Sequence, residues 1–249
     1  MGDQYPDAFE LSERMTIPNP PPPVTLFMQA TLNKYHVDTA KTISDGFAKY
    51  IDDICGAICD GIDKWMKATT IVGVVINGPV GTLLPAGVLG AVPLNVLILA
   101  SAPVDTPQKL RYSTAIANAF GTLWQLWSMG ITGVLAYPSF AVFAGPVAPP
   151  TPNTPMPLIA LPSVGEAALS PASLKGMMMA NLADPLAHHA LQLFDAIATA
   201  FNIVFQIFKA TTLVKNVMGT GPIPTFAPPF VPGGPVVGGV GIGPPGCIS

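Results

Sequence analysis

Charge is what this sequence has least of. Charged residues make up 10% of the 249 positions, against roughly 25% in typical soluble domains. Asp, Glu, Lys and Arg are absent from three long stretches, which span residues 68–104, 112–165 and 216–249. A surface with so little charge is poorly protected against association, so we expect much of it to be covered in the working protein.

The few basic residues also exclude a class of partner. Lys and Arg number 11 against 14 Asp and Glu, for a net charge of -3, and they are scattered along the chain. Nucleic-acid binding needs a concentrated basic footprint. The sequence therefore predicts no nucleic-acid partner.

Cysteine and export signals are scarce as well. Cys55, Cys59 and Cys247 make no disulfide framework, and the first two are interpreted as small buried hydrophobes on one helix. The first residues have neither the basic segment nor the apolar run of a secretory signal peptide. A location inside the cell before assembly is the interpretation that follows.

Groups for catalysis are sparse. The adjacent His188 and His189 would point about 100° apart on a helix and cannot form the zinc pair that needs four-residue spacing; a metal gathered by these histidines with His36 and Cys247 is not favoured. The nucleophile-elbow motif is absent, and the Gly-rich residues 233–243 lack the Lys-Ser/Thr of a phosphate loop. We expect no enzyme, no cofactor and no metal.

Proline and glycine are abundant instead, at 29 and 24 residues. Disordered chains combine low hydrophobicity with high net charge, whereas this chain is 50% hydrophobic with little net charge. The prolines at 18 and 20–23 predict an extended N-terminal arm over residues 1–35. Residues 36–249 are expected to form a single domain.

The predicted fold is mainly α, with extended Pro/Gly-rich arms and short strands. Asp105 or Thr106 before Pro107, and Ser170 before Pro171, are typical helix starts. Two aliphatic runs, 72–76 and 94–99, predict short strands, but proline confines pairing to sheet edges, so no wide sheet is expected. Helices are predicted at about 38–66, 107–130, 172–182 and 185–217.

One short sequence pattern occurs in three places along the chain. Residues 115–120 resemble 196–201, and residues 67–72 resemble 209–214; each copy precedes an uncharged, Gly/Pro-rich arm. Convergent composition of apolar helices is the simpler explanation. The pattern nevertheless predicts three helix-plus-arm pseudo-repeats in a pseudo-threefold arrangement, at about 36–104, 105–163 and 164–249.

Aromatic side chains on these helices are the candidate functional residues. Uncharged arms can lie along a neighbouring subunit, and obligate interfaces are depleted of charge and enriched in aromatics. Packing within the chain itself is the alternative for each of them. The proposed partner-interface or core anchors are Trp65, Phe120, Trp124, Trp127, Phe201, Phe205 and Phe208.

A membrane offers a second explanation for the missing charge. Residues 68–104 are long enough to span a bilayer, but Pro79, Pro85 and Pro93 interrupt them, and freed backbone groups need partners in lipid. A membrane-interacting protein whose uncharged apolar segments insert into a bilayer is therefore the alternative. A secreted or surface interaction protein is a third.

Three helix-plus-arm units and an uncharged Gly/Pro-rich end resemble the architecture of tip or hub components of phage-tail-like contractile injection particles. In that family PAAR-type proteins cap a trimeric spike. The Pro-Ala-Ala-Arg motif is absent here, with Pro171–Leu174 the nearest stretch, so no zinc ligand is carried over. The resemblance implies a non-enzymatic structural protein that matches a trimeric spike or hub, found in a virion or injection particle.

Overall fold

The structure is a computed structural model that describes residues 23–249 except 185–186, 188 and 230–232, with residues 23–35 described by their backbone only. The chain divides into two compact units, residues 1–53 and 54–249. About 51% of it is helix and 22% is strand. The predicted mainly α fold is therefore wrong, because the chain forms a mixed α/β fold around a seven-stranded antiparallel sheet.

The first unit contains the start of α2 (Pro23–Ala68), which continues into the second. Pro23 is the first helical residue, where its missing N–H is not needed. The helix thus begins well before residue 38, and the extended conformation predicted for residues 23–35 is wrong. Residues 1–22 of the predicted arm lie outside the described residues.

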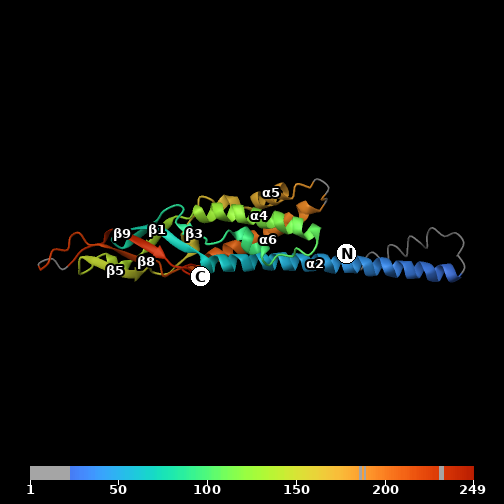
Figure 1. Ribbon diagram of the computed structural model, residues 1–249, viewed down its shortest axis with the longest axis horizontal. Helices are drawn as coiled ribbons and strands as arrows, with labels where there is room; N and C mark the ends of the chain where they lie inside the picture. The colour runs from blue at the N-terminus through green and yellow to red at the C-terminus, as the bar shows by residue number, and fades with distance from the viewer. Residues whose placement is uncertain (1–22, 185–186, 188, 230–232) are drawn as a thin grey trace. The chain divides into compact units, whose positions relative to one another are not determined.

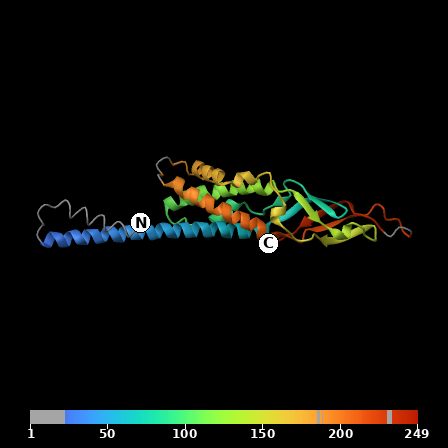
Figure 2. The ribbon, with the colours of Figure 1, turned by 180° about the vertical axis from the view of Figure 1, so that it is seen from behind.

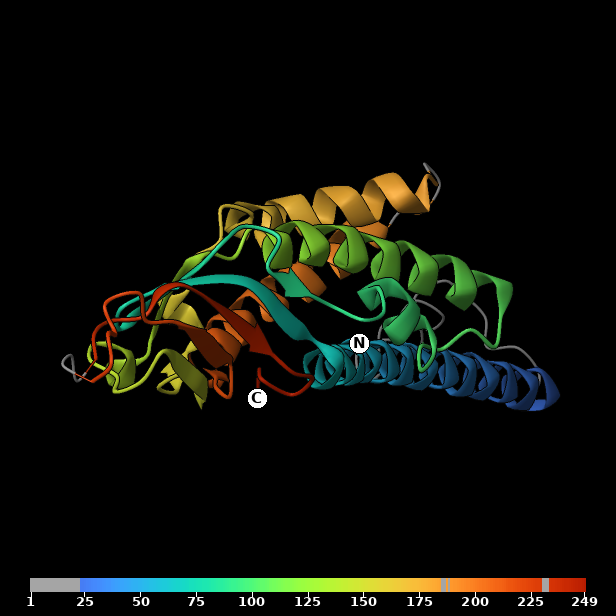
Figure 3. The same ribbon diagram turned by 60° about the vertical axis from the view of Figure 1, so that its left-hand side comes forward.

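The described residues of the second unit form four further helices. They are α3 (Leu94–Leu99), α4 (Pro107–Met129), α5 (Pro171–Leu182) and α6 (Ala190–Thr211). Helix α4 packs against α3 and α5, and α5 packs against α6 (Figures 1 and 3). The predicted strand at 94–99 is wrong, because that aliphatic run forms α3.

Both predicted helix starts are confirmed. The Thr106 Oγ1 atom accepts a hydrogen bond from the Lys109 N–H at 3.2 Å, and the Ser170 Oγ atom accepts one from the Ser173 N–H at 3.4 Å. In each case proline follows the cap, and the cap satisfies one of the free N–H groups of the first turn.

The large sheet has the strand order β4-β2-β1-β9-β8-β5, with β3 also pairing with β1, and every pairing is antiparallel. Figures 1 and 2 show the strands gathered at one end of the second unit and α4, α5 and α6 at the other. The prediction that no wide sheet forms is wrong. Its strands are β1 (Thr70–Asn77), β2 (Val80–Leu83), β3 (Val88–Leu89), β4 (Gly133–Ala136), β5 (Val147–Pro152), β8 (Met218–Pro222) and β9 (Val237–Gly243).

Short elements join these parts. A separate two-stranded sheet pairs β6 (Met156–Pro157) with β7 (Leu213–Val214). Turns of 3-10 helix cover Pro138–Phe140, Leu158–Ala160 and Glu166–Leu169.

Glycines in the strands leave room for aromatic rings on the buried face of the large sheet, which we call its inner face. The Tyr137 and Phe140 rings stack there with centroids 5.3 Å apart. A Cβ atom at Gly219 would lie 2.6 Å from Ile76 Cδ1 and 2.7 Å from the Tyr137 ring. The Tyr137 hydroxyl donates a hydrogen bond to the Val217 carbonyl at 3.0 Å, and burial raises the pKa of this tyrosine.

The repeated pattern corresponds to similar helix ends and not to a repeated structural unit. Thr69 directly follows α2 and Thr211 is the last residue of α6; each hydroxyl donates to the carbonyl four residues earlier, at 2.6 and 2.9 Å. The chain then enters three different places: α2 leads to β1 inside the sheet, α4 to β4 at its edge, and α6 to β7 in the small sheet. The pseudo-repeats and the pseudo-threefold arrangement are therefore wrong.

Candidate interaction surfaces

The seven predicted anchors come together in one aromatic cluster of the second unit. Helix α2 supplies Trp65, α4 supplies three rings and α6 supplies three. Edge-to-face and tilted contacts, which aromatic rings favour, connect them: Trp65–Trp124 at 5.2 Å, Trp124–Trp127 at 4.7 Å, Phe120–Phe201 at 4.8 Å, Trp127–Phe205 at 5.1 Å and Trp124–Phe208 at 5.9 Å between centroids.

Burial differs across the cluster. Phe201 and Phe208 are half-buried, whereas the other five rings are buried. The half-buried pair lines an apolar groove of about 210 Å³ between the last turns of α2 and helix α6. Ile58, Ile62 and Met66 form its α2 wall at four-residue spacing.

Cysteine placement differs from the prediction. Cys55 and Cys59 are exposed, so their assignment as buried hydrophobes is wrong, and Cys59 lies on the rim of the groove. Cys247 is buried, with its Sγ atom 3.8 Å from the Thr69 carbonyl. Burial raises the pKa of the Cys247 thiol to about 11.

Helix α6 presents an uncharged face to solvent. Ile203 is 60% exposed and Ile207 is 58% exposed. The two charged residues of the helix are paired: Asp195 accepts from Lys175 at 2.7 Å, and the buried Lys209 contacts Glu166. With a mean hydropathy of 1.5 and 22% burial, α6 is the one helix of the described chain long and apolar enough to span a membrane.

A second apolar surface covers one face of the large sheet, which we call the outer sheet face. Thr82 on β2 pairs with Val134 on one side and Val75 on the other, and Val75 pairs with Val240. The alternation of strand side chains puts this whole row on one face. Its exposed apolar residues are Val75, Val80, Val134, Val147, Val240 and Ile242. None of the seven strands contains a charged residue.

Both edges of this sheet are closed. Strand β5 carries Pro149, Pro150 and Pro152, which have no N–H to offer another strand. Strand β4 is four residues long; next to it, the Thr154 N–H donates to the Ala136 carbonyl at 2.8 Å, and the Thr132 N–H donates to Pro162 at 2.9 Å. The sheet is protected against edge pairing while its outer face stays open.

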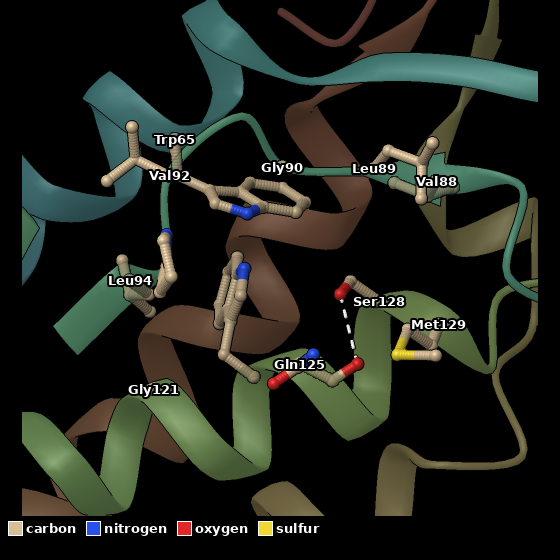
Figure 4. A pocket seen from close by; sticks show the side chains of 12 residues that line it. Trp65, Val88, Leu89, Gly90, Val92, Leu94, Gly121, Gln125, Ser128 and Met129 are labelled. Carbon is tan, nitrogen blue, oxygen red and sulfur yellow. Dashed lines mark hydrogen bonds between the residues drawn. The ribbon is translucent and has the colours of Figure 1, made fainter. Parts of the chain in front are cut away.

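A smaller cavity of about 150 Å³ lies between α2, α3 and α4 (Figure 4). Trp65 and Leu94 line it from one side and Gln125 and Ser128 from the other, and the Ser128 hydroxyl donates to the Gln125 carbonyl at 3.1 Å. The Nε1 atom of Trp124 is buried without a hydrogen-bond partner. The lining contains no titratable side chain, so the cavity supplies neither an acid nor a base.

Comparison of the chain with protein-family models, with curated proteins and with solved structures found no match.

No group of three metal-ligating side chains occurs among the residues that the structure describes. His188 lies outside the described residues, and His189 is the residue immediately before α6.

Sequence reasoning missed the outer sheet face. Its signal is visible in β9, where Val240 and Ile242 alternate with Gly241 and Gly243. Alternation of apolar and small residues is a strand pattern, but the surrounding prolines and glycines favoured an extended arm.

Proposed function

We propose that this chain is a non-enzymatic structural protein of a phage tail or contractile injection particle, in which protein partners cover its apolar surfaces. The outer sheet face is the observation that carries the proposal. It is apolar, uncharged and open, while the edges of the same sheet are closed. A protein that protects its edges yet leaves a face apolar has a specific use for that face.

The partners we propose are proteins of the particle's spike or hub, further copies of this chain among them. The contact does not use internal threefold symmetry, because the fold lacks it. Charge-poor surfaces with an apolar centre suit permanent contacts in an assembly. The smaller cavity, with no acid or base in its lining, supports a structural role over a catalytic one.

Fractionation of particles tests this proposal. The tagged chain is expressed in its source cells, the particles are sedimented, and mass spectrometry compares their composition with that of the soluble fraction. We expect the chain to sediment with tube and sheath proteins in constant ratio. Val240→Lys, on the outer sheet face, should abolish incorporation, whereas Val164→Lys, at a side chain that is 88% exposed, should not. A chain found only in the soluble fraction of particle-producing cells contradicts the proposal.

Helix α6 favours a second candidate function, insertion of an apolar segment into a bilayer. Its length, hydropathy and low burial are the supporting observations. The test is flotation of the purified chain with vesicles of phosphatidylcholine and phosphatidylglycerol. The first proposal predicts no flotation. Flotation that Ile207→Asp removes and Val164→Asp leaves intact would favour the membrane.

A further inference from the structure

We infer that the outer sheet face is covered by a second copy of this chain, with the two sheets packed face to face about a twofold axis. The inference rests on the proposed function in one respect: both take this face to be covered by protein. It adds the identity of the partner.

The side chains of the face indicate another sheet as the occupant. Most of them are valine, isoleucine and threonine, the β-branched residues that interdigitate between the sheets of a sandwich; the registers place Asn77 and Met218 on the same face. Tryptophan, tyrosine and arginine, which anchor most contacts between unlike proteins, are absent from its strands. Lysine and the aromatic residues that bind the surface of a bilayer are absent from them as well.

The absence of charge allows this face to contact a copy of itself without repulsion. In a twofold contact each patch meets itself, so any charge near the axis meets an equal charge. The seven strands hold no charged residue. This face therefore meets its own copy without repulsion, a condition that few surfaces of a soluble protein satisfy.

The size of the face limits the strength of the contact. Six strands of about five residues at the usual spacing cover roughly 24 by 17 Å, or about 400 Å². A second sheet of equal size at the usual separation of about 10 Å would cover about 800 Å² in total, which is at the lower end of specific contacts between proteins. Because both edges are closed by prolines and loop hydrogen bonds, growth by edge pairing does not compete with the face-to-face contact.

The register indicates where the axis passes. Strands β1 and β9 are the middle pair of the order β4-β2-β1-β9-β8-β5, and Val75 faces Val240 across them. An axis through the middle of the sheet brings position 240 of one copy close to position 240 of the other. Substitutions there act twice in each dimer.

Sedimentation equilibrium of the full chain tests the inference. From about 1 to 100 µM, a range that reveals micromolar dissociation constants, we expect a mass of twice 25.8 kDa. Val240→Lys should raise the dissociation constant at least about tenfold, because two like charges then meet near the axis. Ile207→Lys, an equally exposed isoleucine substitution on α6, should leave the dimer intact. Circular dichroism checks that each variant is folded.

A mixing experiment makes the twofold contact explicit. Val240→Lys and Val240→Glu should each be monomeric alone, and their equimolar mixture should recover the dimer mass. A wild-type chain that is monomeric throughout the concentration range overturns the inference, as does a folded Val240→Lys chain that still dimerises. Neither result affects the proposed function, which fails only if the chain is absent from particles.

Discussion

The Phe205 side chain on α6 packs against α4 in the helical half of the second unit. Its buried ring contacts Trp127 at 5.1 Å and Trp124 at 6.0 Å, and it stacks on Phe201 at 5.5 Å. The Lys209 Nζ atom lies 5.1 Å from the ring centroid. Contacts of this kind add to the free energy gained by burying the ring area itself.

Phe205→Ala should therefore destabilise the chain by about 3–5 kcal/mol, because it leaves a cavity between α4 and α6. The melting temperature should fall by roughly 10 °C for a unit of this size. Thermal unfolding followed by circular dichroism measures the change. Ile207→Ala, at a side chain of the same helix that is 58% exposed, is the control and should shift the melting temperature by far less.

The raised pKa of the buried Cys247 thiol predicts that the protein loses stability at alkaline pH. Its folded pKa of about 11 lies above that of an unfolded cysteine, and the pKa of Tyr137 is raised too. Both shifts favour the neutral form in the folded state. The associated stability is present below about pH 9 and is lost as pH rises toward 11.

Urea denaturation at pH 8 and pH 10.5 checks this expectation. Cys247→Ala should reduce the loss of unfolding free energy between the two pH values, because one group with a raised pKa has been removed. Cys59→Ala, at an exposed cysteine, serves as the matched substitution. An equal pH dependence in all three chains would show that the buried thiol has no part in it.

At the level of elements, glycine decides how closely the strands approach the inner aromatic rings. Gly219 on β8 leaves room for Tyr137 and Ile76. Gly219→Ala should cost about 1–3 kcal/mol, because the new methyl group overpacks this contact. In α5, Gly176 has nothing within 4 Å of a Cβ position, so Gly176→Ala should stabilise the chain by up to about 1 kcal/mol. Chemical denaturation of both variants tests the opposite signs.

Elements governed by local chemistry were predictable from the sequence. The starts of α4 and α5 follow from a hydroxyl side chain before proline, Thr106-Pro107 and Ser170-Pro171, and both caps form as predicted. The strand at 72–76 lies within β1. Local hydrogen bonds determine the two caps, and the β-branched run within β1 favours an extended strand by its residue types, so a short window of sequence contains this information.

Elements that depend on distant partners were not predictable. Leu94–Leu99 is aliphatic throughout, which leaves strand and helix equally open, and packing against α4 decides for helix. Strands β8 and β9 contain so much glycine that their sequence indicates an extended arm. Side chains from distant parts of the chain fill the space beside these glycines: Tyr137 and Phe140 at Gly219, and Val74 and Tyr137 at Gly241. The sequence indicates the aromatic anchors by their residue types alone, whereas their contact in one cluster depends on how α2, α4 and α6 pack.

At the level of the whole molecule, the described part of the second unit has two apolar surfaces, the uncharged outer sheet face and the face of α6 with its groove, in which Asp63 is the one charged lining residue. The little charge near α6 is used within the chain, as in Lys175–Asp195 and Lys209–Glu166. Interfaces that are permanent resemble a core divided in two. Both surfaces have this character.

The reactivity of a cysteine placed on the outer sheet face tests the central claim most directly. In a chain with Cys55 and Cys59 replaced by serine, Val240→Cys reports on the face and Val164→Cys on a side chain open to solvent. The measurement is the rate of maleimide labelling in assemblies isolated from source cells. A face covered by protein predicts labelling at position 240 at least about tenfold slower than at position 164. Equal rates at the two positions would contradict the account.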